Sequence, residues 1–295
     1  MKEKEFIKII SNTLKSEYIG DDCAYLKDLG IVISQDNLVE DVHFSMKFTD
    51  AYKLGYKSAM VNISDIAASG AEPKYLTIGL SLPHNIGNEF VENFYKGLKA
   101  ASDQITIVGG DLTGSDKIFI SITAIGLVKD RKISSRKNAK LGYKVIVSGQ
   151  HGASAAGLKD LFEGKQNKFT DVHLMPEAQV NFSSSISQNI NTDYAMMDTS
   201  DGLMDALLQI AEASNVMLDV DFEKIPYDKD LEKYPNYKDL ILYGGEDYQL
   251  VACVPKDFEV KNSYEIGNVI EGHGVQINGE KILNAETKLY NHFKE

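Results

Sequence analysis

The segment VNISDIAASGAEPKYLTIGLSLP, residues 61–83, carries the clearest secondary-structure signals in the chain. Its first part continues an apolar helical pattern that begins after Asp50. Asp50 can cap a helix over residues 51–69, because its side-chain oxygen accepts a hydrogen bond from a free backbone N–H group. Gly70 ends that helix, and the stretch 75–82 has the composition of a strand. The segment therefore predicts a helix followed closely by a strand.

Helical and strand patterns alternate outward from this segment through both halves of the chain. We expect helices over 6–14, 87–103, 153–163, 177–188 and 203–213, strands over 30–34, 105–108, 118–128, 144–147, 195–197, 216–222 and 249–254, and a hairpin at Asn278-Gly279 between 275–277 and 281–283. The polar and basic stretch 131–143 separates the halves. We therefore expect an α/β fold of the α+β type, with domains over 1–130 and 144–295.

Composition and charge limit the classes of partner. The chain has 295 residues, of which 43% are hydrophobic and 25% charged, so it is long and apolar enough for two domains with buried cores. Its formal net charge of −12 repels nucleic-acid phosphates and anionic lipid surfaces. Such a protein can bind polyphosphates where divalent cations bridge the like charges. We expect no nucleic-acid or membrane partner.

The cysteines and the N-terminal residues favour the cytoplasm. Cys23 and Cys253 are the only cysteines, and their separation predicts small buried side chains in a reducing compartment. Residues 1–5, MKEKE, lack the apolar core of a secretory signal. No apolar run approaches the roughly 20 residues needed to span a bilayer.

Acidic residues cluster beside glycines and after strand-like segments. The groups are Gly20-Asp21-Asp22, Asp36, Asn62-Ile63-Ser64-Asp65, Gly109-Gly110-Asp111, Asp198-Thr199-Ser200-Asp201-Gly202 and Gly244-Gly245-Glu246-Asp247. A single aspartate in a turn is ordinarily a cap or an Asx-turn. Six such groups favour a shared metal–phosphate site, because Mg²⁺ prefers oxygen ligands and keeps positions for water and phosphate. Familiar nucleotide fingerprints such as G-x-x-x-x-G-K-[ST] are absent from the sequence.

Ordered motifs along nearly the whole chain resemble those of the thiamine-monophosphate kinase family. This family belongs to the superfamily of aminoimidazole ribonucleotide synthetase and selenophosphate synthetase. The matching stretches are IGDDCAYL (19–26), SQDNLVEDVHF (34–44), residues 61–83, VGGDLTGS (108–115), SITAIGLV (121–128), SRKNAKLGYKVIVSG (135–149), SAAGL (154–158), MMDTSDGL (196–203), GGEDYQLVACVP (244–255) and NHF (291–293).

The resemblance implies a two-domain fold like that of aminoimidazole ribonucleotide synthetase, whose N-terminal sheet pairs across a homodimer. It implies metal ligation by Asp21, Ser34, Asp36, Asp65, Asp111, Asp198 and Asp201, with catalytic roles for Asp111, Arg136 and Asp201. It further implies ATP contacts from Tyr95, Gly110, Asp111, Arg136 and Ser200, and acceptor contacts from His43, Glu246 and Phe293. The pattern alone favours an ordinary strand histidine at His43 and a core aromatic residue at Tyr95.

Two positions depart from the family pattern. Gln35 stands where the family usually has threonine, so a metal role at that position is in doubt. Ala153 replaces an aspartate that the family often carries near a helix start. The central aspartates are unaffected by either change.

The activity that the resemblance implies is transfer of the γ-phosphoryl group of ATP to thiamine monophosphate. Several Mg²⁺ ions would bridge the nucleotide and the aspartates, and transfer would be direct and in line. Two alternatives stay open at this stage. One is another ATP-dependent synthetase of the superfamily, and the other is a non-catalytic binder of thiamine phosphates.

Overall fold

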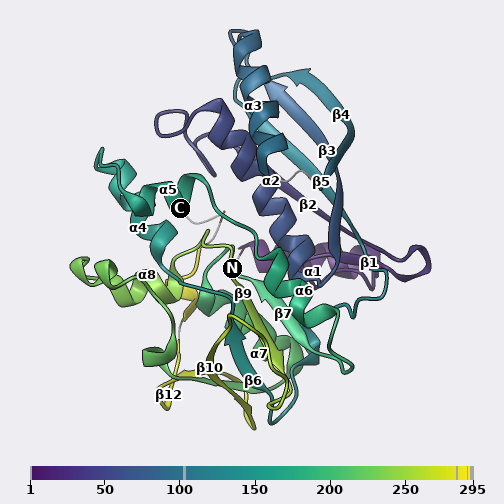
Figure 1. Cartoon of the computed structure of the whole chain (residues 1–295), viewed down its shortest axis with the longest axis vertical. Coiled ribbons are helices and arrows are strands. Elements are labelled where there is room, and N and C mark those ends of the chain that lie inside the picture. The colour runs from purple at the N-terminus through teal and green to yellow at the C-terminus, as the bar shows by residue number, and fades with distance from the viewer. Residues whose placement is uncertain (1, 102–103, 284, 291, 293–295) are drawn as a thin grey trace.

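Two β-sheets, each packed with helices, form the upper and lower parts of the molecule in Figure 1. The computed structural model describes residues 2–101, 104–283, 285–290 and 292, and for residues 2–4 and 286 the backbone alone. Among the described residues, no helix is both long and apolar enough to cross a membrane.

The first sheet has five strands in the order β1-β2-β5-β3-β4. These are β1 (Ala24–Leu26), β2 (Ile31–Val39), β5 (Phe119–Leu127), β3 (Glu72–Leu82) and β4 (Thr106–Gly114). Only β3 and β4 pair in parallel, and the other neighbours are antiparallel. Helix α2 (Ala51–Ala68) lies against β2, β3 and β5, and α3 (Asn88–Ala101) packs along α2.

Strand β5 shows why this sheet has two different faces. Ile120, Ile122 and Ala124 are buried towards α2, whereas Phe119 and Ser121 alternate with them and stay half-buried on the other face. Successive side chains of a strand point to opposite faces, so this alternation makes one face the core and leaves the other partly open.

The second sheet has seven strands in the order β12-β11-β8-β10-β6-β9-β7. They are β6 (Lys144–Val147), β7 (Ala195–Asp198), β8 (Met217–Val220), β9 (Leu250–Val254), β10 (Tyr264–Ile270), β11 (Gly274–Ile277) and β12 (Glu280–Lys281). Every residue of β6, β7 and β9 is buried. Both faces of these strands are therefore covered, which explains their nearly continuous apolar sequences.

Two hydrophobic cores flank the second sheet. Val145 and Val147 of β6 join a core with α7 (Leu203–Ser214), whereas Ile146 between them joins a core with α6 (Val180–Ser187). Residues of α4 (Ala153–Phe162), α5 (Lys168–Leu174) and α8 (Tyr237–Tyr243) add to the first of these cores.

Helix α2 joins the two halves of the molecule. Its last residues, Ala67 and Ala68, lie in the same core as Ile146 of the second sheet. The hydroxyl of Ser183 in α6 donates to the Ala67 carbonyl at 2.6 Å, and that of Ser134 donates to the Ala68 carbonyl at 2.6 Å. One end of α2 is therefore anchored to the second sheet, while the rest covers the first.

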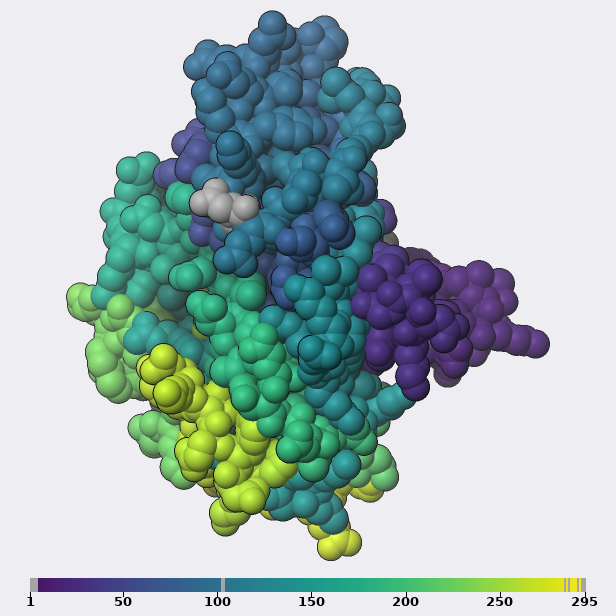
Figure 2. All heavy atoms as spheres, turned by 45° about the vertical axis from the view of Figure 1, so that its right-hand side comes forward, coloured from purple at the N-terminus to yellow at the C-terminus, as the bar shows by residue number. Residues whose placement is uncertain are grey.

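Helix α1 (Lys2–Leu14) stands away from both sheets. The purple N-terminal segment projects from the body of the molecule in Figure 2. Phe6, Ile9 and Leu14 of α1 are 43%, 54% and 65% exposed, although their spacing is that of an amphipathic helix. The apolar side of α1 is therefore largely open in the single chain.

The predicted fold class is confirmed. Helix α2 and its cap also match, since the Asp50 side chain accepts from the Lys53 N–H at 2.8 Å. The hairpin at Asn278-Gly279 is present, with positive φ angles at both turn residues. The domain limits and the linker at 131–143 stay predictions.

Several element boundaries in the sequence prediction were wrong. Strands β1 and β10 and helices α5 and α8 have no counterpart among the predicted elements. The helix expected over 177–188 covers only Val180–Ser187. The strand expected over 30–34 continues to Val39, and the one expected over 105–108 continues to Gly114. Polar and glycine residues suggested an early end to both strands, but backbone pairing with β5 and β3 carries the strands through them.

The crossing of α2 and α3 generates a stability prediction. A Cβ atom at Gly97 would lie 1.9 Å from the Tyr52 carbonyl oxygen, so only glycine fits this close helix contact. We expect Gly97→Ala to lower the free energy of unfolding by about 2 kcal/mol or more, because the backbones must separate. Gly87→Ala is the matched control, since nothing lies within 4 Å of its added Cβ. Chemical denaturation measures both, and equal stabilities would contradict the packing described.

Candidate functional site

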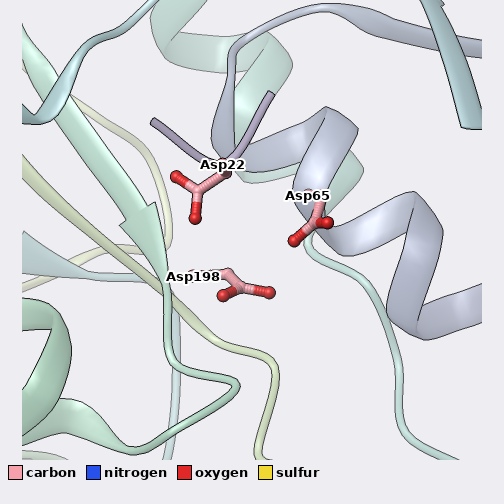
Figure 3. A group of neighbouring side chains, drawn as sticks. All are labelled: Asp22, Asp65 and Asp198. Carbon is pink, nitrogen blue, oxygen red and sulfur yellow. The ribbon is translucent and has the colours of Figure 1, made fainter. Parts of the chain in front are cut away.

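Three aspartate side chains from separate parts of the chain converge where the two halves meet (Figure 3). Asp22 precedes β1, Asp65 lies on α2, and Asp198 is the last residue of β7. One carboxylate oxygen of each lies within 4.8 Å of the others. This spacing is compatible with shared coordination of a cation by the three carboxylates.

Strand alternation aims Asp198 at α2. Met196 of β7 points into the core shared with α2 and α6, so Asp198, two residues later, points to the same side. Ser64 of α2 donates to Asp198 Oδ2 at 2.6 Å, and Ser200 donates to Oδ1 at 2.8 Å. Asp198 is only 1% exposed, so its orientation is fixed.

Strand β2 brings two further oxygen-bearing side chains towards α2. Ser34 and Asp36 alternate with outward-facing residues and so face α2. The Ser34 hydroxyl donates a short hydrogen bond to Asp65 Oδ2. The amide side chain of Asn62 in α2 accepts from the Asp36 backbone N–H at 3.3 Å.

Burial, together with neighbouring aspartates, raises the pKa values of Asp22, Asp36 and Asp65. Burial raises the pKa of Asp22 to about 7, and nearby Asp198 adds to the rise while Arg136 opposes it. Burial, with Asp198, raises the pKa of Asp36 to about 6. Burial, with Asp36 and Asp198, raises the pKa of Asp65 well above its usual range. Crowded carboxylates favour a bound cation, and an all-oxygen donor set fits Mg²⁺.

Arg136 supplies positive charge beside this group. Its guanidinium Nη2 lies 2.8 Å from Asp22 Oδ1, and its Nη1 donates to Gln209 on α7. Burial opposes its charge, but Asp22 outweighs that effect and raises the pKa of Arg136. The side chain is therefore held at the edge of the aspartate group.

Asp22 is the residue that the sequence analysis missed. The Asp21 carboxylate instead accepts hydrogen bonds from the Ser135 hydroxyl at 2.8 Å and the Arg136 backbone N–H at 2.7 Å. The two adjacent carboxylates therefore have different partners, and Asp22 is the one that converges with Asp65 and Asp198. The Asp21-Asp22 pair was the available signal, but it does not say which one faces inward.

A cavity of about 1280 Å³ extends from this aspartate region. The residues that line it include Asp65 of the aspartate group, together with Asp36, Ser200 and Asp201. Its other lining residues include His43, Lys57, His173 and Glu246, together with aromatic side chains such as Phe48 and Tyr290. One continuous cavity therefore joins an acidic region to a mixed polar and aromatic one.

One stripe of α2 forms a wall of this cavity. Leu54, Lys57, Val61 and Asp65 all line it, at the spacing of a single helix face. Lys57 and Asp65 are eight residues apart, which is about 12 Å along a helix that rises 1.5 Å per residue. Helix α2 thus separates two polar subsites by a fixed distance.

Glu246, whose carboxylate contacts Lys57, has an unusual backbone conformation. Its φ angle is 65°, and its backbone N–H donates to the Ser200 carbonyl at 2.7 Å. A non-glycine residue in this left-handed region is strained and often marks a functional site. Glu246 Oε2 lies 3.1 Å from Lys57 Nζ and 3.3 Å from His173 Nδ1.

The neighbouring Asp247 has a different role. Its two carboxylate oxygens accept from the backbone N–H groups of Gly152 and Ser154 at 2.6 and 2.8 Å. This carboxylate satisfies the free N-terminal N–H groups of α4. The Glu246-Asp247 pair therefore divides between the cavity and a helix terminus.

The structure does not bring every predicted site residue into this cavity. His43 lines it, and its Nδ1 accepts from the Val39 N–H at 3.0 Å. Tyr95 is exposed on α3, and the register of β4 with β3 puts Asp111 opposite Gly79 on the partly open face. Phe293 lies outside the described residues.

Gly110 has a structural reason to be glycine. A Cβ atom there would lie 1.9 Å from the Ile78 carbonyl oxygen of β3, so the close strand pair excludes any side chain. The contact with ATP that the resemblance implies stays a prediction, as does that of Tyr95.

The expected positions of some aspartates were wrong in detail. Asp36 and Asp111 lie within strands β2 and β4 rather than after strands or in turns, whereas Asp65 lies within α2, as the helix expected over 51–69 requires. Asp198 is in a core environment, whereas the sequence suggested a less buried position. Polar residues are typical of the ends of strands and helices. In this structure, polar side chains of β2, α2 and β7 instead face one another across the junction of the two halves.

The first half of the chain matches a known family model. Residues 20–128 match the family model described as AIR synthase related protein, N-terminal domain. That range includes Asp22, Asp36 and Asp65 and most of the first sheet.

The chain resembles characterised kinases over nearly its full length. It is 35% identical to the thiamine-monophosphate kinase of Aquifex aeolicus (strain VF5), covering 97% of this chain and 96% of that protein. It is 34% identical to that of Bacillus subtilis (strain 168), covering 94% and 93%. A solved structure described as AaThiL complexed with AMPPCP and TMP superposes with a TM-score of 0.90 at 35% identity, covering 99% and 98%. The chain belongs to the thiamine-monophosphate kinase family.

Proposed function

We propose that this protein transfers the γ-phosphoryl group of ATP to thiamine monophosphate, giving thiamine diphosphate. The observation that carries the proposal is the single cavity lined by both Asp65 and the Lys57–Glu246 pair. Family membership supports the same activity, since the relatives are thiamine-monophosphate kinases and a solved neighbour was complexed with AMPPCP and TMP.

The aspartate end suits the triphosphate of ATP. Asp22, Asp65 and Asp198 would hold Mg²⁺, with further oxygen atoms available from Ser34, which bonds to Asp65, and from Asp36 and Asp201, which line the same cavity. Bound Mg²⁺ neutralises charge on the phosphates and on the aspartates. Ser64 and Ser200 fix the Asp198 carboxylate, and Arg136 fixes Asp22.

The opposite end suits the acceptor. Its aromatic and acidic lining fits a cationic thiazolium ring, which the Glu246 carboxylate and aromatic faces would attract. An acceptor phosphate is already largely ionised near neutral pH, so the chain needs no general base to activate it. Positioning of the two substrates then accounts for most of the catalysis.

The assembly and the location are also part of the proposal. We infer a homodimer in which a second copy covers the partly open face of the first sheet, where Phe119, Ser121 and Thr123 lie. The exposed apolar side of α1 gives a second surface for such a partner. The proposal also includes a cytoplasmic location, which we expect from the cysteines and the N-terminal residues.

The choice of acceptor substrate can be tested directly. Purified protein with ATP and Mg²⁺ should release ADP with thiamine monophosphate, and free thiamine should be a poor acceptor because an alcohol needs a general base. A coupled assay for ADP release measures both rates. Faster turnover of thiamine, or ligand binding with no ADP release, would overturn the proposed activity and favour a synthetase or a non-catalytic binder.

A second prediction concerns the aspartates. Asp65→Asn and Asp198→Asn should each lower the turnover rate on the order of 10²-fold or more, because a lost ligand misplaces the γ-phosphoryl group. Asp28→Asn, at an exposed position on the same domain, is the matched control and should keep its rate. Near-normal activity of either variant at limiting Mg²⁺ would show that its aspartate is not a metal ligand.

The stability of the same variants should depend on pH. Raised pKa values in the folded state stabilise the protein fully below the unfolded value of 3.8, and this contribution is lost as pH rises through about 6 to 7. With a chelator present, Asp65→Asn should therefore melt at a higher temperature than the wild-type protein near pH 8, and the gain should shrink near pH 5. A loss of stability at both values would make the role of Asp65 structural.

The dimer is tested by light scattering at micromolar concentration. The wild-type protein should have twice the chain mass of 32.7 kDa. Ile125→Glu, on the partly open face of β5, should shift the mass towards one chain while the helix content is retained. A wild-type mass of one chain would contradict the proposed dimer.

A further inference from the structure

The acceptor end of the cavity contains a buried lysine that the sequence analysis gave no role. Lys57 lies in the middle of α2, and its side chain is 5% exposed. A buried lysine is costly unless its charge is paired. Its ammonium group lies 3.1 Å from Glu246 Oε2, and both residues line the cavity.

His173 of α5 completes this arrangement from the opposite side. Its Nδ1 lies 3.3 Å from Glu246 Oε2 and 2.9 Å from the Ser154 hydroxyl of α4. The Glu246 carboxylate is thus held by side chains from two different helices. Its own backbone is fixed by the hydrogen bond to Ser200 and by the close packing of Gly245, where an added Cβ would lie 2.6 Å from the Ser200 carbonyl oxygen.

We propose that Lys57 is a positioning residue for the acceptor, which pairs with the Glu246 carboxylate and holds it in the cavity wall to receive the cationic ring of the thiamine moiety. His173 supports the same carboxylate. This inference rests on the proposed function, and it assigns to Lys57 an effect on the acceptor that passes through Glu246.

The charges around Glu246 support this assignment. Burial alone would raise the pKa of Glu246, but Lys57, with smaller effects from His173 and His43, more than offsets burial, and the net shift of this pKa is downward. The other titratable groups that face it are His173 and His43, with Asp247 adjacent in sequence. Burial and Lys57 lower the pKa of His173 to about 4, and burial and His292 lower that of His43. Both histidines are therefore neutral near pH 7, and Lys57 supplies the full positive charge.

The test measures the dissociation constants of thiamine and thiamine monophosphate by calorimetry, for the wild-type protein and Lys57→Met. Because Lys57 acts through the carboxylate that meets the ring, both ligands should lose about tenfold in affinity. Lys57→Arg, which keeps the charge, should restore part of the loss. Lys96→Met, at an exposed lysine of α3, is the matched control and should bind both ligands normally.

A double-mutant cycle separates the proposed role from a structural one. In the Glu246→Gln background, Lys57→Met should cost no further affinity, because the group through which it acts is gone. This double variant also removes both charges together, so it avoids leaving one of them buried and unpaired. In Lys57→Met alone, affinity should depend more strongly on pH than wild-type affinity does, and it should rise with pH, because Glu246 has lost the neighbouring charge that favours its ionised form.

Each result either supports or overturns the proposed role of Lys57. A loss confined to thiamine monophosphate would make Lys57 a phosphate ligand and overturn the inference, as would losses that add in the double variant. An equal rise in the KM for ATP would point to a general structural role and also overturn it. If the wild-type protein bound neither thiamine nor its monophosphate, the proposed function itself would fail.

Discussion

The structure depends on holding several like-charged carboxylates together at the junction of its two halves. Asp22 and Asp65 belong to the first half and Asp198 to the second, yet their oxygens come within 4.8 Å of one another. Such crowding in a partly buried place opposes ionisation, as the raised pKa values of Asp22 and Asp65 show. The folded chain therefore carries an electrostatic cost at this place, and a bound cation would relieve that cost.

Helix α2 determines the geometry of the site. Its apolar residues fill the core of the first sheet, its C-terminal alanines lie in a core of the second, and its polar residues line the cavity. Asp65 and Lys57 occupy one face of this helix, about 12 Å apart by helical rise. A rigid helix thus sets the separation between the acidic subsite and the Lys57–Glu246 pair. Under the proposed function, this one secondary-structure element would position both substrates. This design suits phosphoryl transfer, which depends on orientation and charge more than on an enzyme nucleophile.

Sequence reasoning predicted the mixed fold, the capped helix α2 and a shared oxygen-ligand site, because these depend on local periodicity and residue chemistry. The resemblance assigned a metal role to Asp21 and none to Asp22, since which of two adjacent carboxylates approaches a distant helix depends on the tertiary structure. Sequence reasoning also ended strands β2 and β4 too early, because polar residues inside a strand resemble a strand end until their pairing partners are known. Lys57 and His173 gave no motif, and they gain meaning only where folding places them beside Glu246.

The central claim is that Asp22, Asp65 and Asp198 jointly coordinate the cation that binds the nucleotide. The most direct test is anomalous diffraction from crystals grown with Mn²⁺ and AMPPCP, because Mn²⁺ takes the oxygen ligands of Mg²⁺ and can be located by its own signal. The account predicts an anomalous peak at coordination distance, roughly 2.0–2.3 Å, from carboxylate oxygens of all three aspartates and next to the analogue's phosphates. Mn²⁺ bound without these aspartates, or nucleotide bound away from them, would contradict it.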